Sequence, residues 1–87
     1  MADFSDFAHE MTRRGALLLA RRNGVDPAMI DPDDVRFNVE TLFGPGGEEG
    51  VMITVWADLD RSVKPAEFEG DSEKAFEAFL KALGEVE

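Results

Sequence analysis

The sequence contains no cysteine and a single histidine, His9. The absence of cysteine excludes disulfides, thiolate metal sites and cysteine nucleophiles together. One histidine cannot form a histidine-based metal site. General-base catalysis would need an oriented partner, and the neighbouring Glu10 projects in another direction on a helix. We therefore expect His9 to be a solvated surface residue, and the chain to hold no metal and no cofactor.

Long apolar stretches are also missing. The longest runs from Gly15 to Ala20, far short of the ~20 residues that span a bilayer. The first residues include Asp3 and Asp6 and no apolar segment of the signal-peptide kind. A chain without cysteine suits a reducing compartment. These features predict a cytoplasmic protein that does not enter a membrane.

Basic residues are scarce, and their distribution is uneven. Lysine and arginine total 9 against 19 aspartates and glutamates, which gives a net charge of −10. Residues 1–30 are balanced, so all the excess negative charge lies in residues 31–87. Such a field repels nucleic-acid phosphates and attracts basic surfaces, although solubility alone explains many acidic surfaces. We expect a protein partner with a basic surface and no direct binding of nucleic acid. The abundance of arginine, alanine, glycine and aspartate is typical of a GC-rich bacterial or phage genome.

A chain of 87 residues predicts one domain over residues 1–87. Apolar residues at three- and four-residue steps predict a first helix from Phe4 to Asn23, ended by Gly24. Gly15 weakens its middle, which indicates that another element approaches there. In the connector that follows, Met29 and Ile30 are expected to reach the core.

Two strands come next, over residues 35–43 and 51–58, joined by a glycine-rich loop. The simplest joining is an antiparallel hairpin. We expect residues 61–70 to be irregular, because Pro65 interrupts them, apart from a short third strand that residues 61–64 could form. A final helix is expected to start after Asp71 or Ser72 and to end at Gly84. The fold class is α+β, a small domain of α-β-β-α order in which the hairpin packs on two helices.

This order resembles the topology of the double-stranded-RNA-binding domain, which runs α-β-β-β-α. That family binds phosphates through a basic start of its C-terminal helix. The corresponding residues 70–74 here, Gly-Asp-Ser-Glu-Lys, are acidic. The resemblance implies a topology only, and it transfers no binding residue to this chain.

The second strand separates its side chains sharply between two faces. Val51, Ile53, Val55 and Ala57 line the face expected to meet the helices. Met52 and Trp56, with Leu42 of the first strand, point to the opposite face. If the helices cover both faces of the sheet, these side chains are buried. If one face stays open, they form an exposed patch of the kind that marks interfaces.

Two further groups of residues are candidates for partner binding. Arg14 and Arg21 lie seven residues apart on one side of the first helix and can dock an acidic partner, although a solvated stripe is the simpler interpretation. Glu48 and Glu49 put negative charge in the glycine-rich loop, which makes phosphate binding there improbable. The acidic segment 58–69 has part of a calcium-loop pattern but carries Val63 where the sharp turn needs glycine, so we expect an ordinary loop.

No arrangement of residues predicts catalysis, because the many carboxylates and three serines lack partners in any recognisable pattern. The sequence therefore predicts a non-catalytic protein-interaction module. An acidic inhibitor of a basic partner, of the phage anti-defence or nucleic-acid-mimicking kind, is one form of it. The alternative is a structural subunit of a homo-oligomer or phage particle that assembles through the sheet. The predicted contact residues are Met52, Trp56, Leu42, Arg14, Arg21, Glu48 and Glu49.

Overall fold

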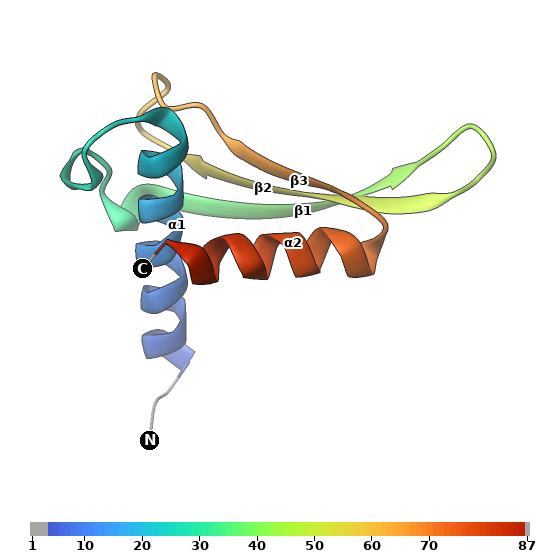
Figure 1. Cartoon of the computed structure of the whole chain (residues 1–87), viewed down its shortest axis with the longest axis horizontal. Coiled ribbons are helices and arrows are strands. Elements are labelled where there is room, and N and C mark those ends of the chain that lie inside the picture. Colours follow the sequence, from blue (N-terminus) through green and yellow to red (C-terminus); the bar gives the residue numbers. More distant parts are fainter. Residues whose placement is uncertain (1–3, 87) are drawn as a thin grey trace.

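The computed structural model describes residues 4–86 of the chain, and the side chains of residues 6–86. Two helices and a three-stranded antiparallel sheet form a small α+β domain (Figure 1). The helices are α1 (Phe4–Asn23) and α2 (Ser72–Glu85). The strands are β1 (Val35–Phe43), β2 (Glu49–Ala57) and β3 (Ala66–Gly70), in the spatial order β1-β2-β3. The predicted fold class is confirmed.

Helix α1 ends as the sequence predicts. Gly24 has a φ of 66°, in the left-handed region that favours glycine. The amide of Val25 donates to the carbonyl of Ala20 at 3.0 Å, and the amide of Gly24 to that of Arg21 at 3.4 Å. These two bonds form a Schellman motif, which satisfies carbonyls that the helix leaves without a partner.

The connector between α1 and β1 contains two short 3₁₀ turns, Pro27–Met29 and Pro32–Asp34. Each turn is capped by the side chain of the aspartate before its proline. Ile30 is buried, as expected, but Met29 is 71% exposed. The prediction that Met29 reaches the core is wrong, because the tight first turn directs it to solvent.

The prediction of a third strand over residues 61–64 is also wrong in position. Those residues form a turn, in which the Asp60 side chain accepts a hydrogen bond from the amide of Ser62. Asn23 at the end of α1 then holds Lys64 through two hydrogen bonds. The amide of Lys64 donates to Oδ1 of Asn23 at 2.8 Å, and Nδ2 of Asn23 donates to the carbonyl of Lys64 at 3.0 Å. The strand begins only after Pro65, at Ala66.

Both helices lie on the same face of the sheet (Figure 1). The buried side chains of the strands all point to that face, among them Ile53 and Val55 of β2 and Phe68 of β3. Phe79 of α2 packs edge-on against Phe68, with ring centroids 5.6 Å apart. Asp71 caps α2 by accepting from the amide of Lys74, and the helix runs one residue beyond the predicted end at Gly84.

Gly15 lies at the contact between α1 and β1. A Cβ atom at this position would stand 2.8 Å from Cγ1 of Val35 and 3.0 Å from Cζ of Phe37. The close approach that the glycine predicts is therefore present. From this contact, the N-terminal half of α1 continues past the edge of the sheet, and the β1–β2 hairpin extends as an arm on the other side (Figure 1).

Candidate interaction surface

One face of the sheet has no helix on it, and none of its side chains is buried. Strand alternation places on this open face the even-numbered residues of β1 and β2 and the odd-numbered residues of β3. They are Arg36, Asn38, Glu40, Leu42, Met52, Thr54, Trp56, Glu67 and Glu69. The structure thus decides between the two alternatives for Met52 and Trp56: both lie on an uncovered face.

The strand register sets the neighbours of each side chain on the open face. Met52 of the central strand lies between Glu40 of β1 and Glu69 of β3. Thr54 has Glu67 on the β3 side, and Trp56 has Arg36 on the β1 side. Met52 and Trp56 are both half-buried. Along β2, the apolar side chains Met52 and Trp56 are thus separated by Thr54. Three of the side chains beside this row are acidic, Glu40, Glu67 and Glu69.

A hollow of about 420 Å³ opens beside Trp56. It exists because β3 pairs with β2 only as far as Val55, so the end of β2 has no strand on this side. Its wall is the loop that carries Asp58, Asp60 and Arg61. An indole ring next to two carboxylates suits a cationic side chain, which the ring attracts through its negative face.

Leu42, Glu48 and Glu49 lie together on the hairpin arm. They line a shallow groove of about 660 Å³ that Glu69 also borders. Leu42 is half-buried, whereas the two glutamates of the loop are exposed. Leu42 pairs with Gly50, six residues along β2 from Trp56, which is roughly 20 Å in an extended strand. The arm and the Trp56 hollow are therefore two ends of one long surface.

The two arginines predicted to dock a partner contact α2 instead of standing free on α1. Arg14 donates from Nη1 to the carbonyl of Leu83 at 3.1 Å, and Arg21 from Nη1 to that of Glu85 at 3.0 Å. Cationic groups at the C-terminal end of a helix bind its last carbonyls and complement its dipole. These contacts give both arginines a role within the fold, and partner docking through them stays a prediction.

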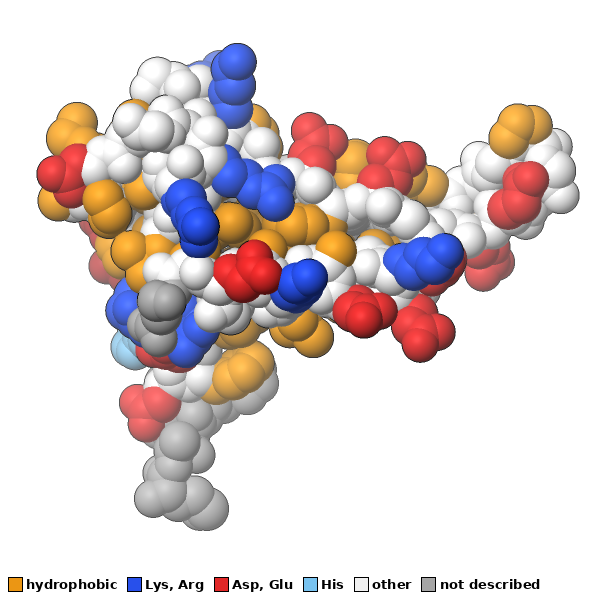
Figure 2. Space-filling view, viewed as in Figure 1, with side chains coloured by type: hydrophobic (Ala, Val, Ile, Leu, Met, Phe, Trp, Pro, Cys, Tyr) orange, Lys and Arg blue, Asp and Glu red, His pale blue; other side chains and the backbone are white. Residues whose placement is uncertain are grey.

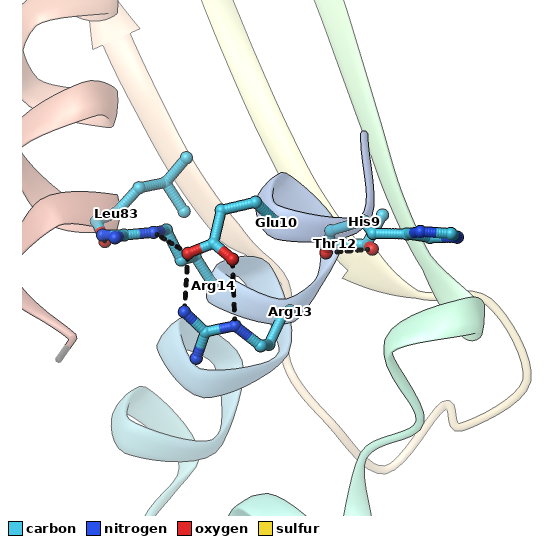
Figure 3. A network of polar contacts seen from close by, with 6 residues as sticks. All are labelled: His9, Glu10, Thr12, Arg13, Arg14 and Leu83. Atoms are coloured by element: carbon cyan, nitrogen blue, oxygen red, sulfur yellow. Dashed lines mark hydrogen bonds and ion pairs between the residues drawn. The ribbon is translucent and has the colours of Figure 1, made fainter. Parts of the chain in front are cut away.

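Arg14 also takes part in an ion-pair network on α1 (Figure 3). Its Nε lies 2.8 Å from Oε1 of Glu10, and Arg13 binds the same carboxylate through Nη2 at 2.6 Å and Nε at 3.2 Å. The hydrogen bonds from Arg13 and then Arg14 lower the pKa of Glu10 to about 2. The His9 ring points away from this network (Figure 3) and is exposed. His9 and Glu10 therefore do not face each other as an acid–base pair would.

The acidic segment 58–69 does not converge on one point. The side chain of Asp60 accepts hydrogen bonds from both the amide and the hydroxyl of Ser62. Glu69 lies in β3 next to Met52. Within residues 4–86, no group of three or more histidine, aspartate or glutamate side chains is arranged to hold a metal ion. In the same part of the chain, neither helix has the length and apolar character needed to cross a membrane.

Sequence reasoning missed one part of this surface, the acidic flank made by β3. The alternation of Ala66, Glu67, Phe68 and Glu69 is a clear strand signal, but Pro65 just before it favoured an irregular segment. No family model, curated protein or solved structure matches this chain.

Proposed function

We propose that the protein is a non-catalytic interaction module that binds a basic protein surface with the open face of its sheet. The observation that carries this proposal is the position of Met52 on the central strand, between Glu40 and Glu69. Apolar side chains at the centre and charged side chains around them are the usual anatomy of a protein interface.

Trp56 supplies the second apolar anchor. Tryptophan is enriched among the few residues that dominate binding energy, provided that the partner excludes water around it. Here the neighbouring hollow, with Asp58 and Asp60 on its wall, can receive a lysine or arginine of the partner. A cation over an indole ring contributes about 0.5–2 kcal/mol, depending on how far it is desolvated.

The charge of −10 acts over a longer range than these contacts. It steers a basic partner towards the molecule and speeds association at low salt. A partner whose basic groove normally holds nucleic acid would fit both the charge and the elongated shape of the surface. Inhibition of such a partner, with carboxylates in place of phosphates, is the form of the function that we favour.

The second candidate function is that of a subunit that assembles with copies of itself through the sheet. It would use a different surface, the unpaired edge of β1, and leave the open face available. The two functions are therefore separable by mutation.

The experiment begins with affinity capture of a partner from the native host and continues with the purified pair. We expect the dissociation constant to rise at least tenfold between 50 and 500 mM salt, because screening removes most of the attraction between exposed charges. Glu67→Lys should weaken binding further, whereas Glu77→Lys, the same charge change on the exposed side of α2, should have a much smaller effect. Equal effects of the two variants, or an affinity independent of salt, would contradict the proposal.

A further inference from the structure

The N-terminal half of α1 has an apolar side that stays partly exposed to solvent. Among the side chains of α1 that the structure describes, residues 6–23, the buried ones fall within residues 15–20. Phe7 is 60% exposed and Met11 only half-buried, although both are on the side that faces β1 and α2. A 20-residue helix is about 30 Å long, whereas β1 and β3 of a three-stranded sheet lie only about 10 Å apart. The helix crosses the sheet and overhangs it beyond β1 (Figure 1).

The overhang borders an apolar groove of about 300 Å³. Its lining includes Phe7 and Met11 of α1, Phe37 and Val39 of β1, and Phe79 of α2. Val39 is 52% exposed although it points to the helix face of the sheet. Hydrophobic side chains are visible below α2 and beside this half of α1 in Figure 2. The groove lies where one more strand, added next to β1, would cover it.

The backbone of β1 is ready to accept such a strand. The amide of Gly44 donates to the carbonyl of Glu48, and the amide of Asp58 to that of Asp34. In an antiparallel pair, hydrogen-bonded and non-hydrogen-bonded residues alternate, so the even-numbered residues of β1 bond to β2. Consequently the amides and carbonyls of Phe37, Val39 and Thr41 point away from β2. Within residues 4–86, no strand pairs with this edge.

The chain has a large surface for its mass. Its accessible surface of 6041 Å² exceeds by about 950 Å² what a compact monomer of this mass exposes. The radius of gyration of 13.8 Å likewise exceeds the roughly 12 Å expected for 87 residues. One side of a stable protein interface covers about 800 Å². The excess surface is therefore enough for one dimer interface.

We propose that two copies of the chain form a symmetric dimer in which their β1 strands pair antiparallel and continue the sheet. Pairing centred near Val39 sets odd-numbered residues opposite odd-numbered ones, as the free backbone groups require. On the open face, it brings Asn38 opposite Glu40 of the second copy and Arg36 opposite its Leu42, so no two acidic side chains stand directly opposite each other.

In this dimer, the hairpin arm of each copy lies across the overhanging half of α1 of the other copy. Val39 and Phe43, which is 69% exposed, would then pack on Phe7 and Met11. The dimer does not depend on the proposed function, because it leaves the open face of both sheets uncovered.

Sedimentation equilibrium of the purified full chain tests the proposal. We expect a mass of twice 9.6 kDa at micromolar concentration. Val39→Lys puts a charge into the groove at the paired edge and should weaken dimerisation at least tenfold, since one buried anchor is worth 1.4 kcal/mol or more. The matched control is Val25→Lys, the same substitution at an exposed valine that follows the C-terminal end of α1, outside the paired edge, and it should leave the mass unchanged.

Hydrogen exchange of the unmodified protein keeps the test independent of how the variants fold. The amides of Val39 and Thr41 should exchange at least tenfold more slowly in concentrated than in dilute protein, and the change should be absent at α2. A monomer at all concentrations would overturn the proposal. So would a dimer that Val39→Lys leaves intact, or the discovery that the strand of a different protein occupies this edge in place of a second copy.

Discussion

Arg14 of α1 donates a hydrogen bond of 3.1 Å to the carbonyl of Leu83, 69 residues further along the chain. The same guanidinium is held from the other side by Glu10 at 2.8 Å. Because Leu83 lies in the last turns of α2, this contact fixes where the two helices cross. One polar contact thus joins the two helices in addition to their apolar packing.

The first prediction follows from this contact. Arg14→Ala should lower the free energy of unfolding by about 1 kcal/mol, because it removes a charge-assisted bond to a partly buried carbonyl. Arg61→Ala, a truncation of an exposed arginine in a loop, is the control and should change stability by less than about 0.5 kcal/mol. Urea denaturation of both variants measures the difference, and equal stability of the two would refute the structural role of Arg14.

The carboxyl of Glu10 gives a prediction for pH. Because the pKa of Glu10 in the folded protein is lowered to about 2, its contribution to stability is fully present above its ordinary value of 4.5. That contribution is lost as the pH falls towards 2, where the carboxylate becomes protonated. Carbon-detected NMR titration should show Glu10 still ionised at pH 3. Glu10→Gln should lose less stability between pH 5 and pH 2.5 than the unmodified protein, and an identical loss would argue against the network.

Two glycines in helices should respond in opposite directions to the same substitution. Gly15→Ala forces a methyl group against Val35 and Phe37, and overpacking of this kind costs about 1–3 kcal/mol, more than the gain in helix propensity. Gly84→Ala meets no atom within 4 Å and should stabilise α2 by up to about 1 kcal/mol. Thermal unfolding of the two variants checks the signs, and a stabilised Gly15→Ala would mean that α1 lies further from β1.

Truncation of Trp56 and of Phe79 should affect stability differently, because Trp56 lies on the open face and Phe79 in the core. Phe79 is buried against Phe37 and Phe68, so Phe79→Ala should cost about 3–5 kcal/mol, close to the whole stability expected of a domain this small. Trp56→Ala removes a half-buried ring from the open face and should leave the domain folded by circular dichroism. An unfolded Trp56→Ala chain would show that the ring is part of the core and would remove the second apolar anchor of the proposed interface.

Most elements of this fold can be predicted from the sequence, because the local sequence signals agree with the tertiary contacts. The helix over residues 4–23 shows its end in Gly24, and the alternation of Val51 to Ala57 identifies both the strand and its buried face. The sequence places the third strand too early, because Pro65 is expected to interrupt a strand at the point where β3 begins. The segment before β3 is also held by the distant contact between Asn23 and Lys64. The alternation from Ala66 to Glu69 does give a local strand signal, but it is short and directly follows the proline.

The candidate surface was less predictable than the fold. That Met52 and Trp56 share a face follows from strand alternation alone. Whether a helix covers that face depends on the side from which α1 and α2 approach, which the sequence of the strands does not encode. The flanking role of Glu69 and the backbone groups exposed at Val39 both depend on the register of the strands, which only the folded sheet defines.

The bonds between Asn23 and Lys64 also bear on how the chain folds. They join residues 41 positions apart, and the segment between them contains the whole β1–β2 hairpin. Closing so large a loop has an entropic cost that other contacts must offset first. The last turn of α1 should therefore be among the latest parts of the domain to become fixed during folding. Truncation of Asn23 should consequently leave the refolding rate nearly unchanged.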